Sequence, residues 1–119
     1  MLSEPNLEFW YSPFSRLEVI LQPTKEKRKD ELRFYEEYFS HANCYGALDR
    51  IFEIGSMEAM KHGIKIADAF HVAAANLSKC SVLVTAEKVT SPMFHTKLVR
   101  VVSIAGYNNP QTIRKLIGP

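Results

Sequence analysis

The sequence has few cysteines and no long apolar run. Cys44 and Cys80 are its only cysteines, and they stand in neither a CxxC nor a zinc-type spacing. A disulfide between them is one alternative, but two reduced thiols of an intracellular protein are the expected state. The chain does not open with a charged segment followed by an apolar one, and no apolar stretch approaches the roughly 18 residues that a membrane span needs. We therefore expect a cytoplasmic location and no membrane partner.

A strong excess of one charge is also absent. Fifteen Lys and Arg residues face 13 Asp and Glu residues, which gives a formal net charge of +2. This mildly basic balance is compatible with an RNA partner but falls short of a strong electrostatic footprint. The length of 119 residues and the 46% of hydrophobic residues fit one compact domain over residues 1–119, which needs no disulfide or metal to hold a core.

Helices and apolar strands follow one another along the chain. Ser12 and Pro13 suit the N-cap and the first position of a helix that we expect to end at Pro23, and Thr24 suits the N-cap of a second helix. We expect the strand at 81–85 to be buried on both faces, because it is apolar throughout. Such strands between helices indicate an α/β sandwich with a largely parallel sheet. The other predicted elements are strands at 7–11 and 98–104 and helices at 47–62, at 66–78 and from 110.

Three carboxylates are candidates for chemistry. Asp68 lies in the first turn of a very apolar helix. There the helix dipole stabilises its negative charge, or the side chain ligates a metal at the rim of the sheet. Glu87 follows the strand at 81–85, as a metal ligand or as a solvated acid paired with Lys88. Glu18 lies within an amphipathic helix, as a third ligand or as an exposed helical glutamate.

Three carboxylates that converge on one site need a counter-charge. At about 4 Å each pair repels by roughly 4 kcal/mol at an effective dielectric constant near 20, so a divalent cation or raised pKa values must relieve the cluster. Ligand sets made only of oxygen favour Mg²⁺ or Mn²⁺ over zinc. Such a cation activates water and steadies the charge that develops on a phosphodiester.

These segments also carry a family resemblance. Residues 67–75 (Ala-Asp-Ala-Phe-His-Val-Ala-Ala-Ala), the strand Val-Leu-Val-Thr at 82–85 and the acid at Glu87 resemble the signature of PIN domains, a family of metal-dependent nucleases. Residues 12–19 resemble the PIN element that carries a catalytic glutamate. Residues 85–88 and 91–94 are similar to a bacterial, especially cyanobacterial, subgroup with glutamate where others have aspartate. The resemblance covers about residues 8–104.

The resemblance implies a fold, an activity and a set of site residues. The fold is a three-layer α/β/α sandwich, and the activity is Mg²⁺- or Mn²⁺-dependent cleavage of single-stranded RNA, often by the toxin of a toxin–antitoxin pair, so an antitoxin is an expected partner. By motif position, Glu18, Asp68 and Glu87 are the metal-binding acids and Thr85 supports the site. We expect the RNA contacts at Lys88, Lys97 and Arg100.

One element of the family pattern is missing. PIN domains begin with a central strand that ends in an aspartate, and nothing before Leu7 fits it. Unpaired backbone groups at the sheet centre would cost roughly 1–3 kcal/mol each. We therefore expect either a longer cellular protein or a homo-oligomer whose chains pair or exchange elements. Two further hypotheses stay open, a non-catalytic RNA- or protein-binding module of this fold and an unrelated α/β protein.

Overall fold

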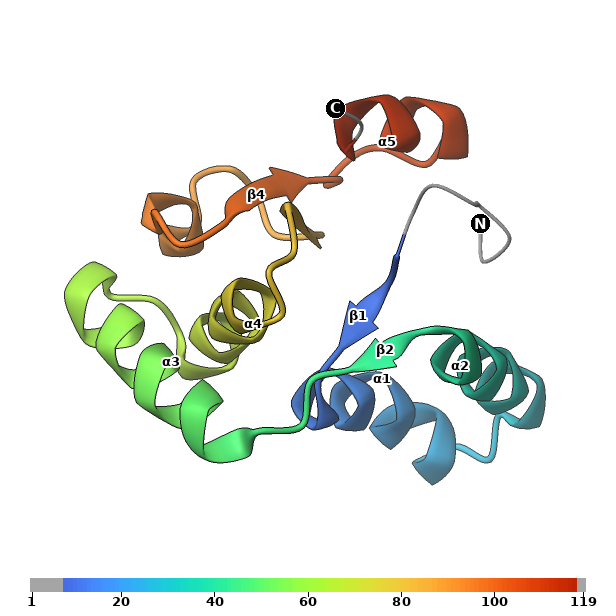
Figure 1. The fold of residues 1–119 in the computed structure, drawn as a ribbon. Coiled ribbons are helices and arrows are strands. Elements are labelled where there is room, and N and C mark those ends of the chain that lie inside the picture. The colour runs from blue at the N-terminus through green and yellow to red at the C-terminus, as the bar shows by residue number, and fades with distance from the viewer. Residues whose placement is uncertain (1–7, 118–119) are drawn as a thin grey trace. The chain divides into compact units, whose positions relative to one another are not determined.

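The computed structural model describes residues 8–117 (Figure 1). The chain divides after Ala47 into two compact units. The first unit contains β1 (Trp10–Tyr11), α1 (Pro13–Lys25), α2 (Lys29–His41) and β2 (Asn43–Cys44). The second contains α3 (Leu48–His62), α4 (Ile66–Leu77), β3 (Val82–Thr85), the 3₁₀ helix η1 (Pro92–His95), β4 (Arg100–Ser103) and α5 (Pro110–Ile117). The chain is thus a mixed α/β protein.

The start of α1 follows from its cap. The Ser12 hydroxyl accepts a hydrogen bond from the Ser15 amide at 3.2 Å, and the Ser15 hydroxyl accepts one from the Ser12 amide at 2.9 Å. This reciprocal arrangement satisfies two main-chain donors that a helix start leaves unpaired. Pro13 occupies the first turn, where its missing N–H costs nothing. The predicted helix start is confirmed.

The predicted end of this helix at Pro23 is wrong. The helix continues to Lys25 with Pro23 in its last turn, although proline has no N–H to donate to the carbonyl four residues before it. Thr24 does not cap the next helix either, because its hydroxyl donates back to the Ile20 carbonyl at 2.6 Å. The break comes instead at Lys27, whose φ of 54° lies in the left-handed region, and α2 begins after Arg28.

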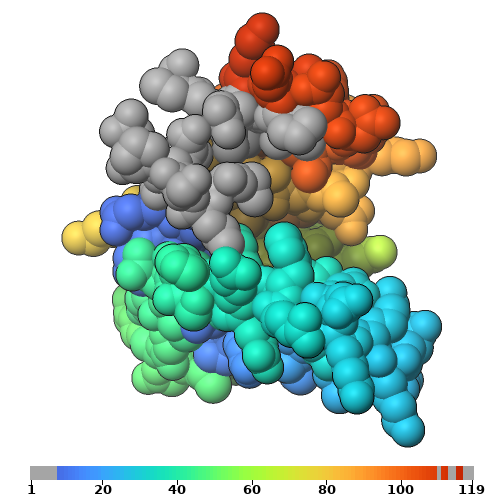
Figure 2. Space-filling view, turned by 90° about the vertical axis from the view of Figure 1, so that its right-hand side faces the viewer, coloured from blue at the N-terminus to red at the C-terminus, as the bar shows by residue number. Residues whose placement is uncertain are grey.

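Aromatic rings hold the first unit together. The ring centroids of Tyr11 and Phe39 lie 4.6 Å apart, and those of Tyr38 and Phe39 lie 5.4 Å apart. Strands β1 and β2 pair in parallel, with Tyr11 opposite Cys44. No side chain of α2 is fully buried, and the helix lies in cyan on the surface of this unit (Figure 2). The side of α2 that packs against the rest of this unit is therefore aromatic and only half-buried.

The second unit has the apolar core. Ile64, Ala69, Val72 and Met93 form a buried cluster, and residues of β3, β4 and their connection pack against it. Helices α3 and α4 approach closely at Gly55, where a Cβ atom would lie 2.5 Å from Cδ1 of Phe70. The absence of a side chain at Gly55 thus leaves room for the Phe70 ring of α4 against α3.

Strands β3 and β4 form a parallel ribbon. Val82 pairs with Arg100, and Thr85 pairs with Ser103. The expectation that this strand is buried on both faces is wrong, because Val84 is 38% exposed. Side chains alternate along a strand, and here only the face that carries Leu83 meets the core. Within residues 8–117 the strands form two separate two-stranded parallel ribbons.

A buried acid anchors the connection between β3 and β4. Glu58 of α3 is 6% exposed, and it accepts a hydrogen bond from the Thr96 hydroxyl at 2.5 Å. The Thr96 hydroxyl also accepts a hydrogen bond from the Leu98 amide at 3.2 Å. Met93, in the same connection, is 2% exposed. The connection is therefore fixed to the core through η1 and the residues after it.

Between residues 8 and 117, no helix combines the length and the apolarity that a membrane crossing requires.

Candidate functional site

Asp68 is placed by the first turn of α4. The N-cap residue, Lys65, makes no side-chain hydrogen bond to the helix start, and the Lys65 carbonyl accepts the Ala69 amide at 2.9 Å. An acid in the first turn interacts favourably with the unpaired main-chain amides there. The Asp68 side chain is half-buried. Its place in the first turn of an apolar helix agrees with the sequence prediction.

Glu87 is placed by hydroxyl groups at the ends of two neighbouring strands. The Thr85 hydroxyl accepts a hydrogen bond from the Glu87 amide at 3.1 Å. The Ser103 hydroxyl donates one to the Glu87 carbonyl at 2.5 Å. The Thr85 carbonyl in turn accepts the Ile104 amide at 2.8 Å. Both main-chain polar groups of Glu87 are therefore fixed, while its carboxylate remains exposed.

Asp68 and Glu87 line the same hollow of the second unit. This hollow has a volume of about 480 Å³ and lies where the start of α4 meets the segment after β3. Its wall combines two carboxylates, two ammonium groups and two hydroxyl groups with small residues. The lining residues are Gly63, Lys65, Asp68, Ala86, Glu87, Lys88, Thr90, Ser91 and Pro92.

The charges that line the hollow balance formally. Asp68 and Glu87 carry two negative charges, and Lys65 and Lys88 carry two positive charges. Within residues 8–117, no three His, Cys, Asp or Glu side chains come together as a metal site would require. Two carboxylates still fit Mg²⁺, because this ion keeps several waters and is often held by one or two carboxylates together with substrate phosphates. The donor set is thus compatible with a hard cation.

Glu18 lies on α1 of the first unit, and its side chain is exposed. Its place beside Asp68 and Glu87 stays a prediction. Thr85 does not line the hollow, but it acts on Glu87 through the main chain. The supporting role predicted for Thr85 therefore has a definite atomic contact.

The predicted RNA-contact residues differ in their surroundings. Lys88 lines the hollow, whereas Lys97 and Arg100 do not. Arg100 donates from Nη2 to the Leu116 carbonyl at 2.8 Å, so its guanidinium is engaged at the end of α5. Of the three, Lys88 has the clearest access to a ligand beside the two acids.

Lys65, Thr90, Ser91 and Ser103 are polar residues of this site that the sequence analysis missed. Ser103 was detectable in principle, because it ends an apolar strand just as Thr85 does, and the carboxyl ends of parallel neighbours meet at one edge. Lys65 and Ser91 lie in connections, where no periodic pattern marks them.

Comparison of the chain with protein-family models, with curated proteins and with solved structures finds no match in any of the three.

Proposed function

We propose that this chain is a PIN-like protein that binds Mg²⁺ or Mn²⁺ and cleaves single-stranded RNA, with Asp68 and Glu87 as metal-binding acids and Glu18 as the third. The observation that carries the proposal is the shared hollow, which is lined by a half-buried aspartate at the start of α4 and by a glutamate after β3. Ligands of open α/β sheets bind beyond the carboxyl ends of the strands. The hollow has this position relative to β3.

The proposal includes the three-layer α/β/α sandwich of the family. In such a fold the strands belong to one mostly parallel sheet. The parallel pairing of β1 with β2 and of β3 with β4 supports this choice over an antiparallel architecture. The βα order of the elements supports it as well.

The charged groups of the hollow and the hydroxyl groups in or near it have roles in the proposed reaction. Asp68 and Glu87 would hold the cation, which supplies Lewis-acid stabilisation of a phosphodiester and a more acidic bound water. Lys65 and Lys88 attract the phosphates of the strand by charge. The hydroxyl of Ser91 is a donor for a phosphate oxygen. Thr85 and Ser103 keep the Glu87 main chain in place.

A second candidate function is a non-catalytic module that binds RNA or protein through the same surface. One observation favours it, namely that only two acids are among the residues that line the hollow. Two carboxylates bind a cation more weakly than a larger set does, so binding without cleavage is a coherent outcome.

The test measures metal binding and cleavage separately. Mn²⁺ binding is followed by the electron paramagnetic resonance signal of the free ion, and cleavage is followed with an unstructured single-stranded RNA, with and without EDTA. Asp68→Asn and Glu87→Gln remove one charge each without changing size. We expect both to weaken Mn²⁺ binding and to lower the cleavage rate by about 10²-fold or more.

Matched controls come from α3 of the same unit. Asp49 also lies in the first turn of its helix and is exposed, and Glu53 is an exposed helical glutamate. Asp49→Asn and Glu53→Gln should leave both measurements unchanged. Cleavage that survives EDTA or persists in Asp68→Asn would refute the nuclease. RNA binding without any metal-dependent cleavage would instead support the non-catalytic module.

A further inference from the structure

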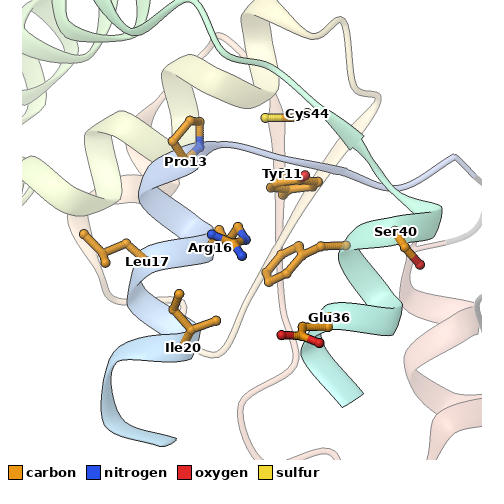
Figure 3. A pocket seen from close by; sticks show the side chains of 9 residues that line it. Tyr11, Pro13, Arg16, Leu17, Ile20, Glu36, Ser40 and Cys44 are labelled. Carbon is orange, nitrogen blue, oxygen red and sulfur yellow. The ribbon is translucent and has the colours of Figure 1, made fainter. Parts of the chain in front are cut away.

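The first unit has a hollow of its own between α1 and α2 (Figure 3). Its volume is about 760 Å³, which lies within the range of small-molecule sites. Every lining residue lies between Tyr11 and Cys44, so the hollow belongs to this unit alone. Figure 3 shows Arg16, Leu17 and Ile20 on α1, with Glu36 and Ser40 opposite on α2.

Two aromatic rings form one wall of this hollow. The centroids of Tyr11 and Phe39 are 4.6 Å apart, with an angle of 50° between the ring planes. Both side chains are half-buried, so their edges are supported by packing while part of each ring remains accessible. Planar ligands stack on such rings, and every nucleobase has a face that suits them.

The guanidinium group of Arg16 lies over the Phe39 ring. The Cζ atom of Arg16 is 5.7 Å from the centroid of the Phe39 ring. Arg16 forms no ion pair with any residue between 8 and 117, and it does not pair with Glu36 across the hollow. A guanidinium has five donors in a fixed fork that matches the oxygens of a phosphate. Arg16 is therefore available for an anionic group.

We propose that this hollow binds one nucleotide of single-stranded RNA, with the base stacked on Tyr11 and Phe39 and a phosphate paired with Arg16. Glu36 and Ser40 supply polar groups at the opposite edge, where the base presents its donors and acceptors. An apolar helix would fit this hollow poorly, because it would remove water from Arg16 without supplying a counter-charge. The inference rests on the proposed function for the choice of RNA as the strand.

The binding experiment excludes the cleavage reaction. Anisotropy of a fluorescently labelled short oligouridylate is measured in EDTA, so that no metal-dependent step takes place. Phe39→Leu keeps an apolar side chain but removes the π face, and Arg16→Gln keeps a polar side chain but removes the charge. We expect Phe39→Leu to weaken binding between about fivefold and about 150-fold, the range for loss of one base-stacking contact. Arg16→Gln should also weaken binding, because it removes the charge that pairs with the phosphate.

The controls come from the same helix pair. Phe34 is 59% exposed and Arg33 is 78% exposed by its side chain, and neither lines the hollow. Phe34→Leu and Arg33→Gln should leave the dissociation constant unchanged. Far-UV circular dichroism of all four variants verifies that the helices are intact.

Two competitors separate the sources of affinity. Uridine monophosphate presents base and phosphate without a strand, and an abasic phosphodiester oligomer presents the backbone without bases. The monophosphate should compete, and the abasic oligomer should compete poorly. Equal competition by the abasic oligomer would show a purely electrostatic surface and would overturn the inference.

The wild-type chain provides a test that no folding defect affects. In an amide NMR titration with the monophosphate, we expect shifts at Ser40, Cys44 and their neighbours around the hollow. Shifts confined to residues 48–117 would overturn the inference. RNA affinity that falls in Arg16→Gln but is unchanged in Asp68→Asn would support it even if no cleavage were found. Cleavage lost in Asp68→Asn, with unchanged RNA affinity in Arg16→Gln and Phe39→Leu, would refute this hollow and keep the proposed nuclease.

Discussion

The Ser103 hydroxyl donates a hydrogen bond to the Glu87 carbonyl from the neighbouring parallel strand, with 2.5 Å between the two oxygens. The same hydroxyl accepts the Ala105 amide at 3.1 Å. Thr85, which pairs with Ser103 in the ribbon, accepts the Glu87 amide. Two hydroxyl side chains at matching positions of β3 and β4 therefore determine the path of the main chain through Glu87.

Replacing Ser103 tests this arrangement. Ser103→Ala removes the donor to Glu87 and the acceptor for Ala105, so the free energy of unfolding should fall by about 1 kcal/mol. Chemical denaturation measures the change, and amide NMR shifts at residues 86–88 report the local path. Ser103→Thr keeps the hydroxyl and should restore most of the stability. Ser81→Ala, at an exposed position before β3, is the control, and an equal loss in both alanine variants would contradict the role of Ser103.

Gly55 tests the contact between α3 and α4. A Cβ atom there would lie 2.5 Å from Cδ1 of Phe70 and 3.3 Å from the Ala69 carbonyl oxygen. Although alanine favours a helix over glycine by up to about 1 kcal/mol, the overlap should dominate, and Gly55→Ala should lower the free energy of unfolding by about 1–3 kcal/mol. Chemical denaturation gives the value.

A double-mutant cycle identifies the clashing side chain. Phe70→Leu should recover part of the loss in the Gly55→Ala background. Gly46→Ala is the control, because nothing lies within 4 Å of a Cβ atom at that position. Simple addition of the two effects would mean that Phe70 is not what excludes the methyl group.

Tyr38 gives a prediction on pH. Burial raises the pKa of its phenol above the ordinary value of about 10. The folded protein then favours the neutral phenol, so this contribution to stability is complete below the pKa of the unfolded chain. It is lost as the pH rises from the unfolded pKa through the folded one. Stability should therefore fall with alkaline pH above about 10.

Denaturation at a series of alkaline pH values measures this slope. Tyr38→Phe should make the fall shallower, because the group that ionises in the unfolded chain is gone. Tyr107→Phe, at a side chain that is 48% exposed, is the matched comparison. Identical slopes for wild type and Tyr38→Phe would show that burial of this phenol does not govern the alkaline loss.

From the sequence, the helices and strands of this fold can be predicted better than the contacts that pack them together. Ser12 and Pro13 mark the start of α1 because their signals are local and involve only the next few residues. Pro23 does not end α1 although it lacks a main-chain donor, and the break comes at Lys27, although lysine seldom adopts positive φ. The exposure of Val84 depends on what packs against each face of β3, which no local pattern records.

The same distinction holds for the candidate site. Asp68 and Glu87 stand out in sequence because an acid within or just after an apolar segment is unusual, and the structure brings both to one hollow. Glu58 did not stand out, because its burial and its bond to Thr96 depend on a contact 38 residues away. Arg16 and Phe39 likewise belong to different helices.

The segment from Lys88 to Ser91 is attached firmly at both sides. Before it, the main chain of Glu87 is bonded to Thr85 and Ser103, and after it Met93 lies in the core. A hydrogen bond from the Ser91 amide to the Lys88 carbonyl, at 2.9 Å, shortens the free span further. So short a span has little slack, and a ligand that contacts Lys88 or Ser91 meets groups whose conformational entropy is already reduced.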